Sequence, residues 1–333
     1  MRRADWAVAF SLIRFNFMSP DPTDGQAMSD RYRAGLEIAR YADSHGFNAV
    51  SLEEHHSTPM AWCPTPLLNA AMILSSTDSL MVTISALLLP LHDPVRAAED
   101  IAVIDLVSPG RLVIVTGLGY RPVEYAAMGK EWERRGRILD DALEVMLTAW
   151  KGEPFTHNGE TVQVLPMPRT RPHPMVLVGG SSPAAARRAA RLGLPMQLPG
   201  QFPDIEALYY AECERHGTQG FCIAPDNVVM LNVATDPDRV WAEHGECFML
   251  EAMTYKGWQP PGQTSAVCSS ATTVEELRAE GIYRVLTPAE AVDLARSTGT
   301  LALHPLVGGM PIDEAWSSVH LTAEQVLPAL AES

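Results

Sequence analysis

Short apolar segments of strand length alternate along this chain with longer segments in which apolar residues recur at helical spacing. The apolar segments predict eight strands, at Trp6–Ile13, Phe47–Leu52, Leu80–Leu88, Leu112–Thr116, Met175–Gly179, Met196–Leu198, Val228–Ala234 and Leu301–Leu306. The segments of helical period predict eight helices, at Asp30–His45, Pro66–Ser76, Pro94–Val107, Glu131–Trp150, Pro183–Leu192, Ile205–His216, Asp238–Ala252 and Ile312–Ala331. Two helix starts are marked by a proline after a capping residue, Pro94 after Asp93 and Pro183 after Ser182.

Eight strand–helix pairs predict an α/β fold, a single (β/α)₈ TIM barrel that occupies residues 1–333 as one domain. A doubly wound parallel sheet is the main alternative. The connection from Ala252 to Thr300, between the seventh and eighth strands, is longer than a helix and two loops need, so we expect an insertion over residues 253–300. In a barrel the active site lies at the carboxyl ends of the strands, and the residues after each strand are therefore the candidates for chemistry.

Charge and cysteine content exclude several classes of function. The 333 residues carry 40 acidic and 25 basic side chains, a net charge of −15 that repels nucleic-acid phosphates and anionic membranes. The five cysteines include no Cys-x-x-Cys pair, so neither a disulfide framework nor a zinc site is expected. No apolar run is long enough to cross a bilayer. These features predict a cytoplasmic protein with no metal, membrane anchor or nucleic-acid partner.

Four ionisable residues, Glu53–Glu54–His55–His56, follow the second strand. Side chains alternate along an extended chain, so these four groups cannot simply converge on one metal ion. Counting from Ala49, a small residue that suits a barrel interior, parity sends Glu53 and His55 to the interior and Glu54 to the other side. A histidine at the mouth titrates near neutral pH and can serve as a base or a hydrogen-bond donor. The alternative is a structural loop histidine held by Glu53 or Glu54.

A turn with two glycines and two serines, Gly179–Gly180–Ser181–Ser182, leads from the fifth strand into a helix. Glycines let the backbone approach a phosphate, the serines add hydroxyl donors, and the amides and dipole of the helix start favour an anion. This pattern predicts a phosphate site. An ordinary tight turn with a serine cap remains the alternative.

A second glycine loop, with Gly117 and Gly119, ends the fourth strand and would let a flat ring or a phosphate lie against the backbone. It lacks the third glycine of a dinucleotide fingerprint. Farther along the chain, residues 134–137 gather three arginines in an otherwise acidic protein. They are either a source of positive charge for the phosphate or a solvated helix start in which Arg137 pairs with Asp141.

Large apolar residues at strand ends and in loops could line a pocket or belong to the core, among them Met60, Trp62, Met310 and Trp316. The segment Tyr255–Ser270 is rich in glycine, proline and serine, a composition that disfavours helix and strand. We expect it to form a loop that covers the barrel mouth, with an uninvolved surface loop as the alternative.

The motifs after the strands resemble, in order and spacing, those of the bacterial luciferase-like flavin-dependent oxidoreductases. The resemblance extends over about residues 45–195 and is carried by Glu54–His55–His56, Leu89–Glu99, Asp105–Leu112, Gly117–Tyr120 and Gly179–Pro183, with a looser match from His304 to Trp316. It implies a barrel, usually dimeric, that holds reduced FMN or a deazaflavin at the carboxyl ends of the strands.

What the resemblance implies for function is a monooxygenase that uses reduced FMN and oxygen to oxidise a small organic substrate, with the flavin supplied by a separate flavin reductase. A deazaflavin-dependent dehydrogenase or reductase is the alternative enzyme, and a non-catalytic flavoprotein subunit is the alternative outside catalysis. The family's catalytic histidine falls on His55, which agrees with the parity argument. Its non-proline cis peptide beneath the flavin ring falls on Ser85–Ala86, and its phosphate loop on residues 179–182.

The chain departs from the luciferase catalytic subunit after the fourth strand. That subunit has a reactive cysteine and a phosphate-binding arginine there, whereas this chain has Thr116–Gly117 and Leu118. The charge of the phosphate must then be met elsewhere, and we assign this role to Arg137, with Arg135 as the alternative.

Overall fold

The computed structural model describes residues 9–225, 229–259 and 268–332, and it is built around one parallel sheet. The strands of that sheet are β1 (Phe10–Phe15), β2 (Ala49–Leu52), β3 (Met81–Leu87), β4 (Leu112–Thr116), β7 (Met175–Gly179), β8 (Met196–Gln197), β9 (Cys222–Ile223), β10 (Met230–Val233), β11 (Tyr283–Leu286) and β12 (Thr300–Leu303). A separate antiparallel hairpin consists of β5 (Phe155–His157) and β6 (Glu160–Val162).

Helices connect the strands. Their bounds are α1 (Gly25–Ser44), α2 (Pro66–Leu74), α3 (Pro94–Val107), α4 (Pro122–Ala127), α5 (Arg135–Ala149), α6 (Pro183–Leu192), α7 (Pro203–His216), α8 (Pro237–Trp258), α9 (Val274–Glu280), α10 (Pro288–Thr298), α11 (Ile312–Leu321) and α12 (Leu327–Ala331). Short 3₁₀ turns lie at Leu89–Leu91, Trp132–Arg134 and Val307–Gly309, and a π-helical turn at Thr322–Val326.

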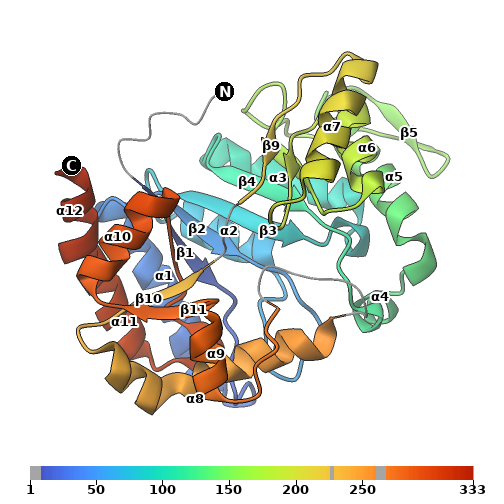
Figure 1. Cartoon of the computed structure of the whole chain (residues 1–333). Coiled ribbons are helices and arrows are strands. Elements are labelled where there is room, and N and C mark those ends of the chain that lie inside the picture. The colour runs from blue at the N-terminus through green and yellow to red at the C-terminus, as the bar shows by residue number, and fades with distance from the viewer. Residues whose placement is uncertain (1–8, 226–228, 260–267, 333) are drawn as a thin grey trace.

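The order of strands across the sheet is β11-β10-β12-β1-β2-β3-β4-β7-β8-β9. From β1 to β8 this order follows the chain, and every neighbouring pair is parallel, as consecutive strand–helix units require. Within the described ranges no strand pairing joins β9 to β11. Figure 1 shows the sheet across the middle of the molecule, with α5–α7 at right, α10–α12 at left and α8 along the bottom.

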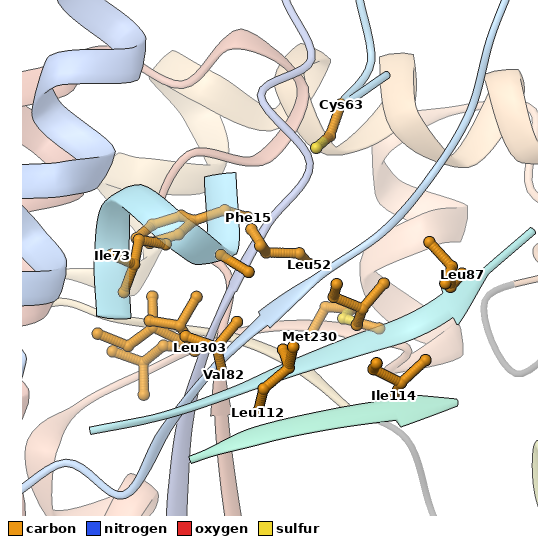
Figure 2. Close-up of a cluster of buried hydrophobic side chains, with 14 of the residues drawn as sticks. Phe15, Leu52, Cys63, Ile73, Val82, Leu87, Leu112, Ile114, Met230 and Leu303 are labelled. Carbon is orange, nitrogen blue, oxygen red and sulfur yellow. The ribbon is translucent and has the colours of Figure 1, made fainter. Parts of the chain in front are cut away.

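Alternate strand residues form the apolar core. Ile13 and Phe15 of β1 and Val50 and Leu52 of β2 are fully buried, which is the period of two that a strand imposes. In Figure 2 Phe15 and Leu52 lie near Ile73 of α2, so this face of the sheet packs against the helices. Burial of each such side chain contributes about 2 kcal/mol.

The eight predicted strands and eight predicted helices are all present, with bounds that differ by a few residues. The bounds of β4, β7, α3 and α6 agree with the prediction. Part of the first predicted strand, residues 6–8, lies outside the described residues. The predicted helix Glu131–Trp150 is a 3₁₀ turn followed by α5, and the last predicted helix contains the π-helical turn.

The expectation that helix ends at Ala252 and that Tyr255 opens a non-helical loop is wrong. Helix α8 continues to Trp258 because Tyr255 and Trp258, three residues apart on one helical face, pack against buried rings. Residues 260–267 of the predicted covering loop lie outside the described residues. Beyond them the chain forms α9, β11 and α10, which the sequence pattern did not predict.

Close packing fixes the position of α8. Gly308 has a φ of 52°, and a Cβ added there would lie 1.7 Å from the carbonyl oxygen of Cys247 in α8. Only glycine lets the turn after β12 approach the helix backbone this closely. In the part of the chain that the structure describes, no helix is long and apolar enough to span a membrane.

Candidate active site

The residues after β2 are buried at the carboxyl end of the sheet. Glu53, Glu54 and His55 are 8%, 2% and 6% exposed. Glu53 accepts hydrogen bonds from Nε1 of Trp62 at 3.1 Å and from the Tyr255 hydroxyl at 2.6 Å, and the ring of His55 contacts the same two rings. The predicted parity of Glu53 and His55 is therefore confirmed.

Glu54 faces the opposite way, as predicted. Its carboxylate accepts a hydrogen bond from the Leu88 amide at 2.6 Å and lies 2.9 Å from Nε2 of His56 and 2.7 Å from Nε2 of His92. Burial acts to raise the pKa of Glu54, but the bonds from His56 and His92, the charge of His92 and the Leu88 amide outweigh it and lower the pKa to about 2. An ionised Glu54 thus holds the end of β2 to the loop after β3.

His55 has a polar partner on each ring nitrogen. Nδ1 lies 3.0 Å from Oε1 of Glu124, and Nε2 lies 3.3 Å from the Tyr120 hydroxyl. The ring of Trp258 packs 4.7 Å from the His55 ring, centroid to centroid. The imidazole is therefore fixed in orientation and enclosed by aromatic side chains.

Glu124 reaches His55 from the first turn of α4. The same Oε1 accepts hydrogen bonds from the His56 amide at 3.0 Å and from Arg121 at 2.9 Å. Burial acts to raise the pKa of Glu124, but the hydrogen bond and charge of His55, the His56 amide and the charge of Arg121 outweigh it and lower the pKa. Oε2 is buried and has no hydrogen-bond partner among the described residues.

The peptide bond between Ser85 and Ala86 is cis, as the family resemblance implied. It lies at the end of β3 beside the second glycine loop: a Cβ added to Gly117 would come within 2.8 Å of the Ala86 Cβ. A Cβ on Gly119, which has a φ of 68°, would lie 3.7 Å from Oε2 of Glu124. The two predicted glycines therefore lie between the cis peptide and the partner of His55.

The Gly179–Ser182 turn joins β7 to α6. Gly180 has a φ of 130°, and its amide donates to the Gln197 carbonyl at 3.1 Å, so that amide is not available to an anion. Ser182 caps α6 by accepting a hydrogen bond from the Ala185 amide at 3.2 Å. The Gln197 side chain also donates to Ser85 Oγ at 3.3 Å, which connects the turn to the cis peptide.

The predicted cations lie elsewhere in the described structure. The Arg137 side chain is 74% exposed and lies 3.9 Å from the Asp141 carboxylate, the pairing expected for a solvated helix start. Arg135 stacks 3.9 Å from the ring of Trp132. Among the described residues no hydrogen bond or ion pair joins either arginine to the 179–182 turn, so a phosphate role for Arg137 stays a prediction.

Comparison with known proteins identifies the family. A family model described as luciferase-like monooxygenase matches residues 9–291. The chain belongs to this family. The oxygenase component of a flavin-dependent trigonelline monooxygenase from Acinetobacter baylyi is 28% identical over 183 residues, 53% of this chain and 51% of that protein. A luciferase-like monooxygenase from Escherichia coli K12 is 29% identical over 206 residues, 60% of this chain and 58% of that protein. The match thus spans little more than half the length of these curated relatives.

Solved structures show the same fold over almost the whole chain. The monooxygenase RslO1 from Streptomyces bottropensis has a TM-score of 0.74 at 23% identity, covering 96% of this chain and 99% of that one. The oxygenating constituent of 3,6-diketocamphane monooxygenase from Pseudomonas putida, solved with FMN, has a TM-score of 0.70 at 20% identity, covering 96% and 98%. The predicted barrel class, that of the luciferase-like monooxygenases, is confirmed.

In this luciferase-like chain a second buried polar cluster, which the sequence pattern did not predict, lies beside the site. Arg14 of β1 pairs with Glu53 and, at 3.2 Å, with Glu251 of α8. Glu251 also accepts from the Asn16 side chain at 2.6 Å and lies 2.7 Å from Nε2 of His304. Burial acts to raise the pKa of Glu251, but the charges of His304 and Arg14 and the bonds from His304 and Asn16 lower it to about 2.

The available signals for these residues were an arginine within the first apolar strand and a glutamate within an otherwise apolar helical stretch. Neither signal identifies its partner. Among the described residues no group of three or more histidine, cysteine, aspartate or glutamate side chains could hold a metal ion.

Proposed function

We propose that this chain is a flavin-dependent monooxygenase that uses reduced FMN and oxygen to oxidise a small organic substrate, with His55 beside the reacting atoms. One observation carries the proposal: direct contacts link the candidate residues into a continuous set. His55 contacts Glu124, which faces Gly119, and Gly117 packs on Ala86. All of them lie at the carboxyl ends of β2, β3 and β4, where barrel enzymes have their active sites.

The Gly179–Ser182 turn, proposed above as the phosphate site, is linked to the same residues, and this link supports FMN as the cofactor. From Ser85 the contacts continue through Gln197 to Gly180, at the start of α6. We propose that the phosphate is held by the hydroxyls of Ser181 and Ser182 and by those amides of this helix start that have no partner among the described residues. Glycine at 179 keeps the turn close to β4, because a Cβ there would lie 3.1 Å from the Thr116 carbonyl oxygen.

The carboxylate of Glu124 also offers a hydrogen-bond acceptor that fits a flavin ring. Oε2 of Glu124 is a buried oxygen of an ionised carboxylate that has no hydrogen-bond partner within the described ranges, and such an atom costs free energy until a donor fills the position. A ligand N–H against Gly119 supplies that donor. Bound reduced FMN would supply the electrons that activate oxygen. His55, enclosed by Trp62, Tyr120 and Trp258, would hold or move a proton at Nε2 and exclude water with these rings.

The comparisons support a two-component system. The Acinetobacter baylyi relative is the oxygenase component of a flavin-dependent monooxygenase, and the 3,6-diketocamphane monooxygenase constituent binds FMN. We therefore propose that a separate flavin reductase supplies reduced FMN to this chain. A cytoplasmic location, argued from the cysteine pattern, remains part of the proposal.

A deazaflavin-dependent dehydrogenase or reductase is the second candidate. An F420-dependent secondary alcohol dehydrogenase has a TM-score of 0.65 at 14% identity, so the same fold also accepts a deazaflavin. A non-catalytic flavoprotein subunit is a third, and the enclosed contact between His55 and Glu124 argues against it, because a buried ionised carboxylate is costly to retain without use.

Anaerobic titration separates the three candidates. The chain is titrated with reduced FMN and, separately, with a reduced deazaflavin, and each complex is then mixed with oxygen. We expect tight binding of reduced FMN and an oxygen reaction that His55→Asn changes without changing FMN affinity. Binding of the deazaflavin alone would overturn the monooxygenase, and binding of neither would overturn both enzymes.

We also propose a homodimer. Helices α2 and α3 expose four large apolar side chains, Leu68, Val103, Leu106 and Val107. Such residues on neighbouring helices fit the self-complementary interface of a two-fold dimer. Light scattering of the native chain and of Val107→Glu tests this: we expect a dimer that the charge weakens, and a native monomer would refute it.

A further inference from the structure

We infer that Glu124 is a positioning residue that fixes the hydrogen of His55 on Nδ1 and leaves the lone pair on Nε2, toward the reacting atoms. The inference deepens the proposed function and rests on it for any effect on catalysis. No motif in the sequence marks Glu124.

Nδ1 of His55 lies beside a carboxylate oxygen of Glu124, which can only accept a hydrogen bond. Oε1 of Glu124 already accepts from the His56 amide and from Arg121, and the pKa of Glu124 is lowered, so the group is an ionised carboxylate without a proton to donate. A ring nitrogen 3.0 Å from such an oxygen must donate, because two lone pairs at that distance repel. Nδ1 of His55 therefore carries hydrogen.

The partner at Nε2 completes the assignment. The hydroxyl of Tyr120 lies 3.3 Å from Nε2. Burial and then the charges of Glu53 and Glu124 raise the pKa of Tyr120 well above its ordinary value, so the phenol keeps its hydrogen and can donate. A neutral His55 has one hydrogen, on Nδ1, and its Nε2 accepts the Tyr120 bond until a substrate or cofactor group replaces it.

The position of Glu124 is itself fixed. Arg121 donates to the His56 carbonyl at 2.7 Å as well as to Glu124, and its guanidinium lies 4.1 Å from the centre of the Trp258 ring. These contacts hold the Glu124 carboxylate against the backbone of His56. The tautomer of His55 is thus determined by a residue 69 positions away in the chain.

Nitrogen NMR of the intact chain tests the inference without flavin or substrate. Histidine labelled with ¹⁵N reports which ring nitrogen carries hydrogen in the neutral ring, and His55→Asn identifies the His55 signals. We expect hydrogen on Nδ1 in the native chain. Hydrogen on Nε2 there would overturn the inference outright, whatever the variants do.

Three variants locate the cause. Glu124→Leu removes the acceptor and should give a mixture of tautomers, whereas Glu124→Gln keeps an acceptor oxygen and should retain hydrogen on Nδ1. Tyr120→Phe, the matched control, removes the partner of Nε2 and should leave Nδ1 protonated. An unchanged tautomer in folded Glu124→Leu would refute the positioning role.

Kinetics then connects the tautomer to the proposed reaction. At saturating reduced FMN, Glu124→Leu should lower kcat by about 100-fold, the usual contribution of general acid–base catalysis, while KM for the organic substrate changes little. Glu124→Gln should recover most of that loss. Failure of reduced FMN to bind the native chain would refute the proposed function and leave the NMR result standing, so the two failures are distinguishable.

Discussion

The carboxylate of Glu251, on α8, lies 2.7 Å from Nε2 of His304, which follows β12, and both side chains are fully buried. The other ring nitrogen of His304 lies 3.1 Å from the Arg14 carbonyl oxygen. Both ring nitrogens thus lie within hydrogen-bond distance of an oxygen acceptor. Glu251 therefore connects α8 to the guanidinium of Arg14 on β1 and to the ring of His304 at the carboxyl end of the sheet.

Glu251→Gln should destabilise the chain by about 3 kcal/mol, because it removes one of the two carboxylates that pair with the buried Arg14 and leaves Glu53 as its only counter-charge among the described residues. Equilibrium unfolding in urea measures the change. Glu243→Gln, an exposed residue of the same helix, is the control and should leave the free energy of unfolding unchanged. If Glu251→Gln lowered the free energy of unfolding no more than the control does, the contacts of Glu251 with Arg14 and His304 would not hold α8 in place.

The free energy of unfolding should fall in acid as Glu54 becomes protonated. Its pKa is lowered from 4.5 to about 2 in the folded chain, so its stabilising contribution is present above pH 4.5 and is lost as pH falls toward 2. That shift corresponds to on the order of 3 kcal/mol. Unfolding titrations across this window should show a smaller slope for Glu54→Gln than for the native chain. Glu99 is a partly exposed residue of α3, and Glu99→Gln should keep the native slope. An equal slope in both variants would contradict the prediction.

The sequence predicted those elements whose limits are marked by local chemistry. Asp93–Pro94 and Ser182–Pro183 start α3 and α6 where expected, because a cap followed by proline depends only on neighbouring residues. The end of α8 depends on rings packed from other elements, among them Trp62, and no local pattern contains that information.

The candidate site was predictable to the same degree. His55 follows a strand, so parity gave its direction, and the cis peptide at Ser85 came with the family resemblance. Glu124 and the Glu251–Arg14 pair were missed because their contacts join residues 69 and 237 positions apart. Such contacts are products of the fold, and a single sequence does not state them.

Ser181→Asp should weaken the binding of reduced FMN by at least about tenfold, because it sets a negative charge against the phosphate proposed to lie at the start of α6. Anaerobic fluorescence titration measures the affinity. Ser317→Asp, an exposed position on α11, is the matched control and should bind as the native chain does. Equal affinity of the two variants would place the phosphate away from the 179–182 turn.

Trp258→Ala should raise the release of hydrogen peroxide per reduced FMN consumed while leaving FMN affinity nearly intact. The Trp258 ring covers His55 and is held under the Arg121 guanidinium, so its removal admits water to the proposed site. The sequence predicted that Tyr255–Ser270 covers the site, and on this prediction part of the cover is Trp258, the last residue of α8. Peroxide is measured in a coupled assay with a flavin reductase. The control variant is Trp316→Ala, which removes a similarly half-buried tryptophan of α11. Peroxide release equal to that of the native chain would mean that other residues exclude water from His55.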